Sequence, residues 1–478
     1  MVFLNKTLRQ LRARYILKSC LAQKSQNLIQ LSQAHAVQAF HNAYHKSLSY
    51  RQYIHAKGLS TKDIHDFMSF QKHVPISSKE TVYHDCQMIA DELWGKKSFS
   101  PQSLLLSSGT SGQFAFGLST IEELKKNAIL LEVFLDHYFQ IFRQKTLIIN
   151  CLSVVELPSI YATVVKVGPR VDSLVYVLGN IAPHFDQIII IGDNYFLKNA
   201  IEECLFKGIA LEKLKIHLIL GGAYLAENLR EHLNKVLLAN AKEDGNRRGQ
   251  ILSSMGISEF GLNIFFESQE TIALRKLAQN SSMLRELLFD PTYPDYLPMF
   301  LNYLPQLFLV EEIDQNVVVT NTNQDASLLL VRYNTYDKAR ILSYDFLKGI
   351  LQKIVLPAGK KIEDYLPAFH SPLILMYGRG DYFNLDEEKI YPEQIQDLLF
   401  QNLEMASQIT GYFRLSDGSR GPQLDIQLKK AIAPSSSLEE KFQKQIQSFN
   451  QNLRVSLHFY QDFPYGMELD YQHKFKYF

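Results

Sequence analysis

Cysteine is scarce in this chain of 478 residues, and long hydrophobic runs are missing. The four cysteines are Cys20, Cys86, Cys151 and Cys204. Their wide spacing excludes a zinc cluster and a small-domain disulfide framework, so we interpret them as free thiols in a reducing cytoplasm. The most hydrophobic run, 188–191, is far shorter than the roughly 20 residues that a membrane-spanning helix needs. These absences predict a cytoplasmic protein without a transmembrane segment.

Acidic residues are missing from the first 62 positions, where ten lysines and arginines precede Asp63. We interpret this basic segment as a solvated helix packed on the main domain. A transit peptide, a membrane-surface helix and a nucleic-acid contact are the alternatives that its charge leaves open. No continuous apolar stretch of about 7–15 residues follows the charges, so a secretory signal is not expected.

The remaining composition is that of a folded protein. Hydrophobic residues make up 46% and charged residues 21%, with 50 Lys and Arg against 49 Asp and Glu, which excludes disorder and collagen. At roughly 100–200 residues per domain, the length allows two or three domains. We expect three regions: a helical N-terminal part at 1–97, a core at 98–377 and a small C-terminal domain at 378–478.

Strand-like apolar runs alternate with helix-length amphipathic stretches between residues 100 and 220. The runs are 103–106, 147–152, 187–191 and 215–220. The clearest helical stretch is 122–142, where apolar residues recur on one face. This alternation predicts a mostly parallel sheet with helices on both sides.

Shorter and closer strands are predicted further along the chain. The runs at 307–312, 316–320 and 328–332 indicate a small antiparallel sheet beside the main one. The elements expected in the tail are a helix at 392–406, strands at 409–415, 424–430 and 455–460, and a helix that starts at 434–437. The predicted fold class is α/β: a large N-terminal domain of mixed and parallel sheets between helices, with a small antiparallel sheet, followed by a small α+β domain.

A run of hydroxyl and glycine residues follows the first predicted strand. It comprises Ser107, Ser108, Gly109, Thr110, Ser111 and Gly112. Glycines let backbone N–H groups approach an oxyanion, and hydroxyls donate further hydrogen bonds, so the run is suited to cradle phosphates. It is not a Walker loop, since no Gly-Lys-Ser/Thr follows, and an ordinary Ser/Gly loop has the same composition.

Three further strand ends carry residues suited to a nucleotide. Gly221 and Gly222 end one apolar run, where open α/β sheets bind ligands, although a plain strand-to-helix turn also uses glycine. After another run, Glu259 could hold Mg²⁺ and Ser258 a phosphate oxygen. Asp337 ends a third run, and its carboxylate could accept hydrogen bonds from two ribose hydroxyls; a surface turn explains it equally well.

Taken in order, these segments resemble the adenylate-forming superfamily of acyl-CoA synthetases and related ligases. Within it, the phenylacetate–CoA ligase-like branch is the most similar, and the likeness covers essentially the whole chain. The motifs that carry it are the loop at 107–112, Gly221-Gly222, Gly256-Ile257-Ser258-Glu259, the stretch 332–337, Gly378-Arg379-Gly380-Asp381 and the terminal stretch 473–477. Their order is the order in which the family has them.

The resemblance implies a reaction in two halves. A carboxylate attacks the α-phosphate of ATP to give an acyl-adenylate and pyrophosphate, and a nucleophile, usually a thiol, then takes the acyl group. By this likeness the hydroxyls of the 107–112 loop hold the pyrophosphate end. Ser258 would hold the α-phosphate and Glu259 the Mg²⁺, while Asp337 binds the ribose with help from Arg379.

Two residues near the C-terminus are implied to serve the reaction itself. Lys474 matches the family's late lysine, which bridges the carboxylate and the α-phosphate, although a solvated basic chain end also accounts for it. Asp381 matches the hinge about which the small domain swings between the half-reactions. The C-terminal α+β domain is therefore expected to be mobile.

Four positions depart from the family pattern. Gln113 follows Gly112 in a stretch where a lysine is usual, so one phosphate cation is missing. Met255 replaces the aromatic residue that stacks on adenine, and Ala223 replaces an acidic residue. The acidic run 386–388 stands where a glycine is expected near the thiol donor, and its charge would repel the phosphates of CoA. Adenylation is thus better supported than CoA ligation.

The sequence therefore favours an ATP-dependent, AMP-forming ligase that activates an aromatic or acyl carboxylic acid. It would use Mg²⁺, and its acceptor would be CoA, an acyl-carrier protein or a small amine. The alternative is a degenerate protein of the same fold that binds a nucleotide, an acyl ligand or a protein partner without turnover. Nucleic-acid binding is not expected, because the basic segment lacks interleaved aromatic residues and any recognised module.

Overall fold

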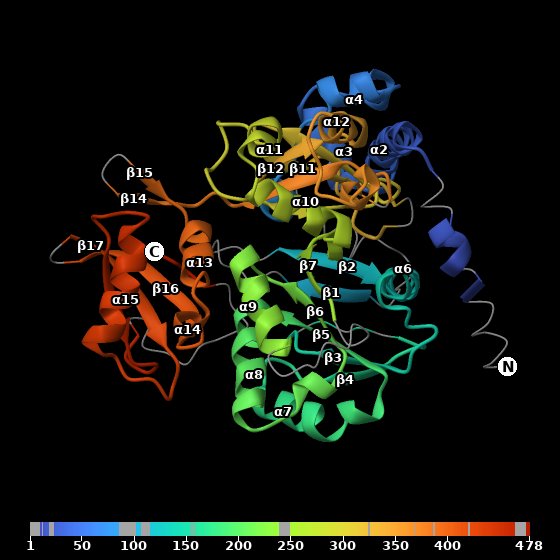
Figure 1. The fold of residues 1–478 in the computed structure, drawn as a ribbon. Coiled ribbons are helices and arrows are strands. Elements are labelled where there is room, and N and C mark those ends of the chain that lie inside the picture. Colours follow the sequence, from blue (N-terminus) through green and yellow to red (C-terminus); the bar gives the residue numbers. More distant parts are fainter. Residues whose placement is uncertain are drawn as a thin grey trace. The chain divides into compact units, whose positions relative to one another are not determined.

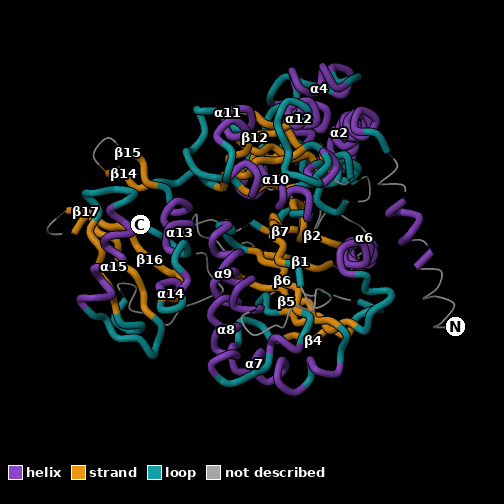
Figure 2. Tube along the Cα trace, viewed as in Figure 1, coloured by secondary structure: helices purple, strands orange, loops and turns teal. Residues whose placement is uncertain are grey.

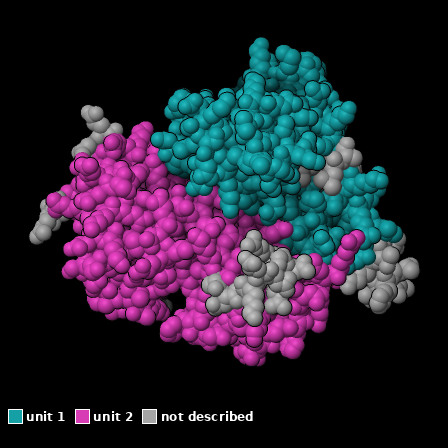
Figure 3. All heavy atoms as spheres, viewed as in Figure 1, with its two compact units in different colours: residues 1–142, 254–380 teal, residues 143–253, 381–478 magenta. Residues whose placement is uncertain are grey.

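The chain forms two compact units, each made of two stretches (Figure 3). Unit 1 combines Met1–Phe142 with Ser254–Gly380, and unit 2 combines Arg143–Ser253 with Asp381–Phe478. The sequence led us to expect three consecutive regions, 1–97, 98–377 and 378–478. That division of the chain stays a prediction. The computed structural model describes residues 10–11, 13–18, 23–85, 102–106, 115–153, 155, 157, 159–238, 249–323, 326–367, 369–385, 388–418, 421–463 and 475–478.

Three helices begin the long described stretch of unit 1. They are α2 (Ser25–Lys46), α3 (Leu48–Ala56) and α4 (Phe67–His73). The Ser47 hydroxyl accepts a hydrogen bond from the Tyr50 N–H, which caps α3 directly after α2 ends. Phe40 of α2 and Phe70 of α4 are fully buried in one apolar cluster. The helical pattern expected for the N-terminal region is thus present in these residues.

Unit 1 also contains a five-stranded antiparallel sheet and three further helices (Figure 2). In the order β10-β11-β12-β13-β9, its strands are β10 (Phe308–Ile313), β11 (Asn316–Asn321), β12 (Tyr333–Leu342), β13 (Leu373–Gly378) and β9 (Met299–Leu301). The helices are α10 (Gln269–Gln279), α11 (Ser282–Leu288) and α12 (Tyr344–Leu351). The sheet confirms the small antiparallel sheet of the predicted fold class.

The strand expected at 328–332 is wrong, because these residues form no strand and β12 begins only at Tyr333. Leu328, Leu330 and Val331 are buried in the apolar cluster that α2, α3 and α4 share. Arg332 has a left-handed backbone with φ of 46°, which interrupts any extended run. An apolar run indicates burial, and here the side chains are buried against helices.

A hairpin and a long helix follow in unit 1. β1 (Gln102–Leu106) pairs antiparallel with β2 (Phe116–Thr120), so the placement of the run 103–106 in a parallel series is wrong. Only residues 107–115 separate the two strands, which is fewer than the dozen or so that a parallel crossover needs. Thr120 then caps α6 (Ile121–Phe139), which ends at the left-handed Gln140 instead of reaching residue 142.

A parallel sheet forms the first part of unit 2. Its strands, in the order β4-β3-β5-β6-β7, are β4 (Thr163–Lys166), β3 (Thr146–Asn150), β5 (Gln187–Asp193), β6 (Ile216–Gly221) and β7 (Ile251–Ile257). β3, β5 and β6 are buried along their length, which explains their continuous apolar runs. The helices are α7 (Val171–Asn180), α8 (Asn194–Phe206) and α9 (Glu227–Leu238). The predicted parallel sheet is confirmed.

The strand β7 runs from unit 2 into unit 1. Its first three residues pair with β6 in the parallel sheet. Its remaining residues pair antiparallel with β8 (Gly261–Phe266), and the turn between these two strands carries Ser258 and Glu259. Among the described residues, no helix combines the length and the apolar character needed to cross a membrane.

The segment 381–478 supplies the rest of unit 2, as an α+β arrangement. Its strands are β14 (Phe383–Leu385), β15 (Glu388–Ile390), β16 (Ile409–Gly418), β17 (Gly421–Leu428) and β18 (Arg454–His458), and its helices are α13 (Pro392–Leu399), α14 (Leu403–Ala406) and α15 (Ser436–Gln447). The single helix expected at 392–406 is wrong. Asn402 accepts from the Met405 N–H and starts a new helix, because its side chain competes for backbone N–H groups.

Glu393 makes the stability of the protein depend on pH. It lies in the first turn of α13, and its Oε2 atom is enclosed without a hydrogen-bond partner. Burial, with a further contribution from Asp381, raises the pKa of this carboxyl from 4.5 to about 8. Between these two values the native state keeps a proton that the unfolded chain releases, so stability falls as the pH rises from 4.5 to 8.

We therefore expect Glu393→Gln to stabilise the protein at pH 8.5 by up to about 5 kcal/mol, and by much less at pH 5, since each pKa unit corresponds to about 1.4 kcal/mol. Urea unfolding at both pH values measures the difference. Glu404→Gln, which changes a carboxylate with 72% of its side chain exposed, is the matched control and should show no such pH dependence. An equal effect of Glu393→Gln at both pH values would contradict the prediction.

Candidate functional site

Glu259 lies in the tight turn of the β7–β8 hairpin. The Phe260 N–H donates to the Ile257 carbonyl at 2.9 Å and closes this turn. Gly256 allows the close approach of the two strands, because a Cβ atom there would lie 3.0 Å from the Gly261 carbonyl oxygen. The turn therefore presents Ser258 and Glu259 at a fixed position on unit 1.

Tyr333, the first residue of β12, holds the Glu259 carboxylate. Its hydroxyl donates to Glu259 Oε1 at 2.6 Å. The Phe260 ring packs edge-on against the Tyr333 ring at 5.8 Å and keeps it in place. Burial, together with the neighbouring Glu259 charge, raises the pKa of Tyr333 far above its ordinary value. The hydroxyl thus stays protonated and donates to the carboxylate at all relevant pH values.

The strand that follows the predicted phosphate loop lies against the same turn. A Cβ atom on Gly117 of β2 would lie 2.2 Å from the Ser258 carbonyl oxygen, so the two backbones are in direct contact. The Tyr83 hydroxyl donates to the Phe116 carbonyl at 2.6 Å. Leu106 and Phe116 pair across the hairpin, so the last residue of β1 lies opposite the first residue of β2.

The ribose-binding pair implied by the resemblance is also present in unit 1. β12 and β13 are antiparallel with Lys338 opposite Gly378, which brings the turn after β13 beside Asp337. Arg379 Nε lies 3.3 Å from Asp337 Oδ1. The Asp337 side chain is 11% exposed and that of Arg379 is 52% exposed. A nearly buried carboxylate beside a half-exposed guanidinium can accept from vicinal hydroxyls while its charge stays compensated.

A lysine that sequence reasoning missed lies in the same region. Ser77 is fastened to the start of β12, since its N–H donates to the Arg332 carbonyl and its own carbonyl accepts from the Asn334 N–H, both at 2.9 Å. Lys79 follows two residues later and is partly buried. Burial lowers the pKa of Lys79, and the charges of Glu259 and Arg379 act on it in opposite directions. Its ammonium therefore lies within electrostatic reach of both.

One sequence signal could have led to Lys79. Gln113 stands where the family has a lysine for the phosphates, so a cation was missing from the predicted site. A search for a replacement among the other lysines would have included Lys79, although nothing local marks it. The Glu80 carboxylate next to it accepts from the Ser78 hydroxyl at 2.7 Å and from the Tyr336 hydroxyl at 3.5 Å.

Two predicted sites lie in unit 2. Gly221 ends β6, and Gly222 follows with a left-handed φ of 88° that favours glycine. A Cβ atom on Gly222 would lie 3.5 Å from Asp193 Oδ2. Asp381, the predicted hinge, is the first residue of the second stretch of unit 2. The convergence of these residues with the unit 1 cluster stays a prediction.

Several predicted residues lie outside the described part of the chain. These are Ser107, Ser108, Gly109, Thr110, Ser111, Gly112 and Lys474. Met255 is partly buried and pairs with Phe265 across the β7–β8 hairpin.

A single carboxylate suits the ion that the resemblance implies. In the part of the chain that the structure describes, no three His, Cys, Asp or Glu side chains form a ready metal cage. Mg²⁺ is usually held by one or two carboxylates together with substrate phosphates. Glu259, oriented by Tyr333 and exposed in part, suits an ion held in this way.

Solved structures of similar fold include 2-hydroxyisobutyryl-CoA ligase. In the postadenylation state with R3-HIB-AMP, it has a TM-score of 0.62 and 11% identity, and the match covers 95% of this chain and 88% of that one. With 2-HIB-AMP and CoA in the thioesterification state, the TM-score is 0.51 at 12% identity, with 91% and 86% covered. No protein-family model and no curated protein sequence matches the chain. The predicted fold class is thus confirmed, as the fold of this ligase.

Proposed function

We propose that the protein is an ATP-dependent, AMP-forming ligase that activates a carboxylic acid as an acyl-adenylate and passes the acyl group to a thiol or another nucleophile. The observation that carries this proposal is the cluster in unit 1. Glu259 held by Tyr333, the Asp337–Arg379 pair and the Lys79 ammonium come from four separate parts of the chain. Together they supply a Mg²⁺ ligand, a ribose acceptor and a phosphate cation.

The proposed first step is a displacement at phosphorus. A carboxylate oxygen of the acid forms a bond to the α-phosphorus of ATP, the bond from that phosphorus to the bridging oxygen breaks, and pyrophosphate leaves. Asp337 would hold the ribose, Ser258 the α-phosphate and the 107–112 loop the departing pyrophosphate. Mg²⁺ on Glu259 would offset the phosphate charge. Positioning and electrostatic stabilisation would supply most of the catalysis.

The remaining roles follow the family pattern. Lys474 would bridge the reacting carboxylate and the α-phosphate, and Asp381 would serve as the hinge of a mobile C-terminal segment. Met255 and Gly256 would lie beside adenine together with Gly221 and Gly222. The acceptor stays open among CoA, an acyl-carrier protein and a small amine, because the acidic run 386–388 disfavours the phosphates of CoA.

ATP–pyrophosphate exchange tests the proposal directly. Purified protein is incubated with ATP, Mg²⁺, labelled pyrophosphate and a panel of aromatic and aliphatic acids. Exchange that requires one acid and falls in Asp337→Ala and Lys474→Ala supports the ligase. Nucleotide binding without exchange, for every acid and with acceptors added, would instead favour a degenerate protein of this fold that binds its ligand without turnover.

Lys79 provides a sharper test of the unit 1 cluster. We expect Lys79→Met to raise the ATP concentration for half-maximal exchange about tenfold, as one hydrogen bond to a charged group is worth about 1.5–3 kcal/mol. The methionine keeps an unbranched side chain and removes the ammonium group with its charge and its hydrogen-bond donors. Lys72→Met changes an exposed lysine of α4 and is the control. An unchanged ATP dependence in Lys79→Met would remove this lysine from the site.

A further inference from the structure

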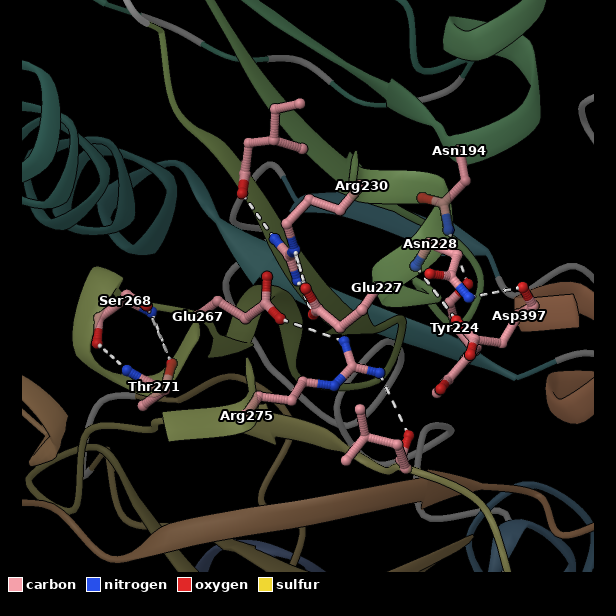
Figure 4. A network of polar contacts seen from close by, with 12 residues as sticks. Asn194, Tyr224, Glu227, Asn228, Arg230, Glu267, Ser268, Thr271, Arg275 and Asp397 are labelled. Atoms are coloured by element: carbon pink, nitrogen blue, oxygen red, sulfur yellow. Dashed lines mark hydrogen bonds and ion pairs between the residues drawn. The ribbon is translucent and has the colours of Figure 1, made fainter. Parts of the chain in front are cut away.

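The helices α8 and α9 form a fixed platform in unit 2. Arg230 of α9 is buried, donates from Nη1 to the Ile251 carbonyl at 2.6 Å and lies 2.9 Å from Glu227 (Figure 4). Asp193 caps α8 by accepting from the Tyr195 N–H at 2.9 Å, and burial raises the pKa of this carboxyl to about 6. Both helices are thereby tied to strands of the parallel sheet.

The segment 381–478 is fastened to this platform, and both helices lie between it and the strands β5 and β6 (Figure 1). From α9, Asn228 Nδ2 donates to the Asp397 carbonyl at 2.9 Å (Figure 4). From α8, Asn199 Nδ2 donates to the Thr410 carbonyl at the same distance. Beside these hydrogen bonds, the Tyr195 ring of α8 packs against the rings of Phe400 and Tyr412 at 6.2 and 5.0 Å, so the contact is partly polar and partly apolar.

Lys198 of α8 is the most buried charge in this contact. Its side chain is 0% exposed, and its ammonium donates to the Ile409 carbonyl at the start of β16. The ammonium also lies 3.1 Å from Glu202 Oε2 and over the Phe400 ring at 5.9 Å. Burial lowers the pKa of Lys198 to about 8. A buried ammonium costs free energy unless it is paired and hydrogen-bonded, and the segment 381–478 supplies one of the partners of Lys198.

Glu202 joins the platform to the segment. Its Oε1 atom lies 2.6 Å from His232 Nε2 of α9, and its Oε2 atom lies 2.5 Å from the Lys429 ammonium, just after β17. Burial alone would raise the pKa of Glu202, but Lys198, His232 and Lys429 together lower it. The Glu202 carboxylate thus neutralises cations from both sides of the contact. If the segment moves away, Glu202 loses Lys429, and its charge is compensated by the groups of α8 and α9 alone.

We propose that Lys198, Glu202 and Lys429 form a latch that holds the segment 381–478 on α8 and α9 and has to open between the two half-reactions. The proposal rests on the proposed function, in which this segment carries Lys474 and moves about Asp381. The three residues act by positioning the segment and do not touch the substrate. They set the fraction of time that the segment spends in the docked arrangement.

Hydrogen–deuterium exchange of the full-length protein measures the latch independently of activity. Lys429→Met removes the ammonium of a partly exposed ion-pair partner and keeps an unbranched side chain, and Lys430→Met, at the exposed neighbouring position, is the matched control. We expect at least fivefold faster exchange in α8 and at the start of β16 for Lys429→Met and wild-type rates for Lys430→Met. Glu202→Gln should speed exchange in the same places. Lys429→Met combined with Glu202→Gln should exchange only slightly faster than the faster single variant, because both remove the same ion pair. Additive increases, or no increase in either single variant, would overturn the latch.

A kinetic measurement decides whether the latch serves the reaction. The rate of pyrophosphate exchange is compared with the rate of acyl transfer to the acceptor. We expect the ratio of these rates to shift at least threefold in Lys429→Met and to stay constant in Lys430→Met. Faster deuterium exchange with an unchanged ratio would show a merely structural contact and overturn the proposal. If wild type shows no pyrophosphate exchange with any acid, the proposed function fails, while the deuterium measurement still establishes or excludes the contact.

Discussion

Glu259→Gln is expected to slow ATP–pyrophosphate exchange by about 10²–10³-fold, which is the usual cost of removing one group that stabilises charge in a transition state. The glutamine can still accept the Tyr333 hydrogen bond, so the turn between β7 and β8 keeps its shape. What is lost is the negative charge that would hold Mg²⁺ against the phosphates. Exchange rates at saturating ATP and rising Mg²⁺ measure the effect, and added Mg²⁺ should not restore the rate.

Tyr333→Phe separates the charge of Glu259 from its orientation. It removes only the hydroxyl that lies 2.6 Å from Glu259 Oε1, and a group that orients a metal ligand is worth about 10–100-fold in metal affinity. This variant should therefore recover most of its rate at high Mg²⁺, unlike Glu259→Gln. Glu286→Gln, on the exposed face of α11, is the control for the loss of a carboxylate. Equal behaviour of Glu259→Gln and Glu286→Gln would exclude Glu259 from catalysis.

The site residues that the sequence predicts are those marked by a strand end. Glu259 follows β7, and Arg379 follows β13, and in both places a short pattern of glycine and polar residues replaces an apolar run. The resemblance implied that Arg379 assists Asp337, and the structure places these two side chains beside each other because β12 and β13 pair. Local patterns thus point to residues in the turns that follow strands, and the roles of these residues stay a prediction.

The residues that escaped prediction depend on contacts between distant parts of the chain. Tyr83 and Phe116 are 33 residues apart, and Tyr336 and Glu80 are 256 apart, so neither pair leaves a trace in local spacing. Lys79 belongs to this group, because only the attachment of Ser77 to β12 brings it near Glu259. Such contacts are decided by the packing of unit 1 and not by the motifs.

Two of the errors in the predicted fold have one physical origin. The apolar runs at 103–106 and 328–332 show that side chains are buried, but not what they are buried against. The first became an antiparallel hairpin strand, and the second packs against α2, α3 and α4 without forming a strand. The break at Asn402 has a different cause, since a capping side chain ends one helix and begins another within an otherwise continuous pattern.

A buried ion pair lies next to the proposed site. Arg332 directly precedes Tyr333, and its Nε and Nη2 atoms lie 3.1 and 3.2 Å from the two carboxylate oxygens of Glu311. Its Nη1 atom donates to the carbonyls of Gln71 at 2.9 Å and Val74 at 2.6 Å, at the end of α4. This one side chain therefore joins α4, β10 and the start of β12.

We expect Arg332→Met to reduce the free energy of unfolding by about 3–5 kcal/mol, because it leaves the Glu311 carboxylate buried without its partner. Burial already raises the pKa of Glu311, so the stranded group should take up a proton. The pair borders a cavity of about 490 Å³, through which water can partly rehydrate the carboxylate. Urea unfolding measures the loss, and pyrophosphate exchange should fall as well, since Tyr333 loses its support.

Two further variants decide whether the charge pair is responsible. Arg170→Met removes an exposed pair with Asp172, whose side chains are 67% and 70% exposed, and should leave the free energy of unfolding nearly unchanged. Arg332→Met combined with Glu311→Met replaces the pair by two apolar side chains and should recover most of the lost stability, because no unpaired charge then stays buried. If the double variant were less stable than Arg332→Met alone, the loss would come from packing and from the hydrogen bonds to α4, and not from a stranded carboxylate.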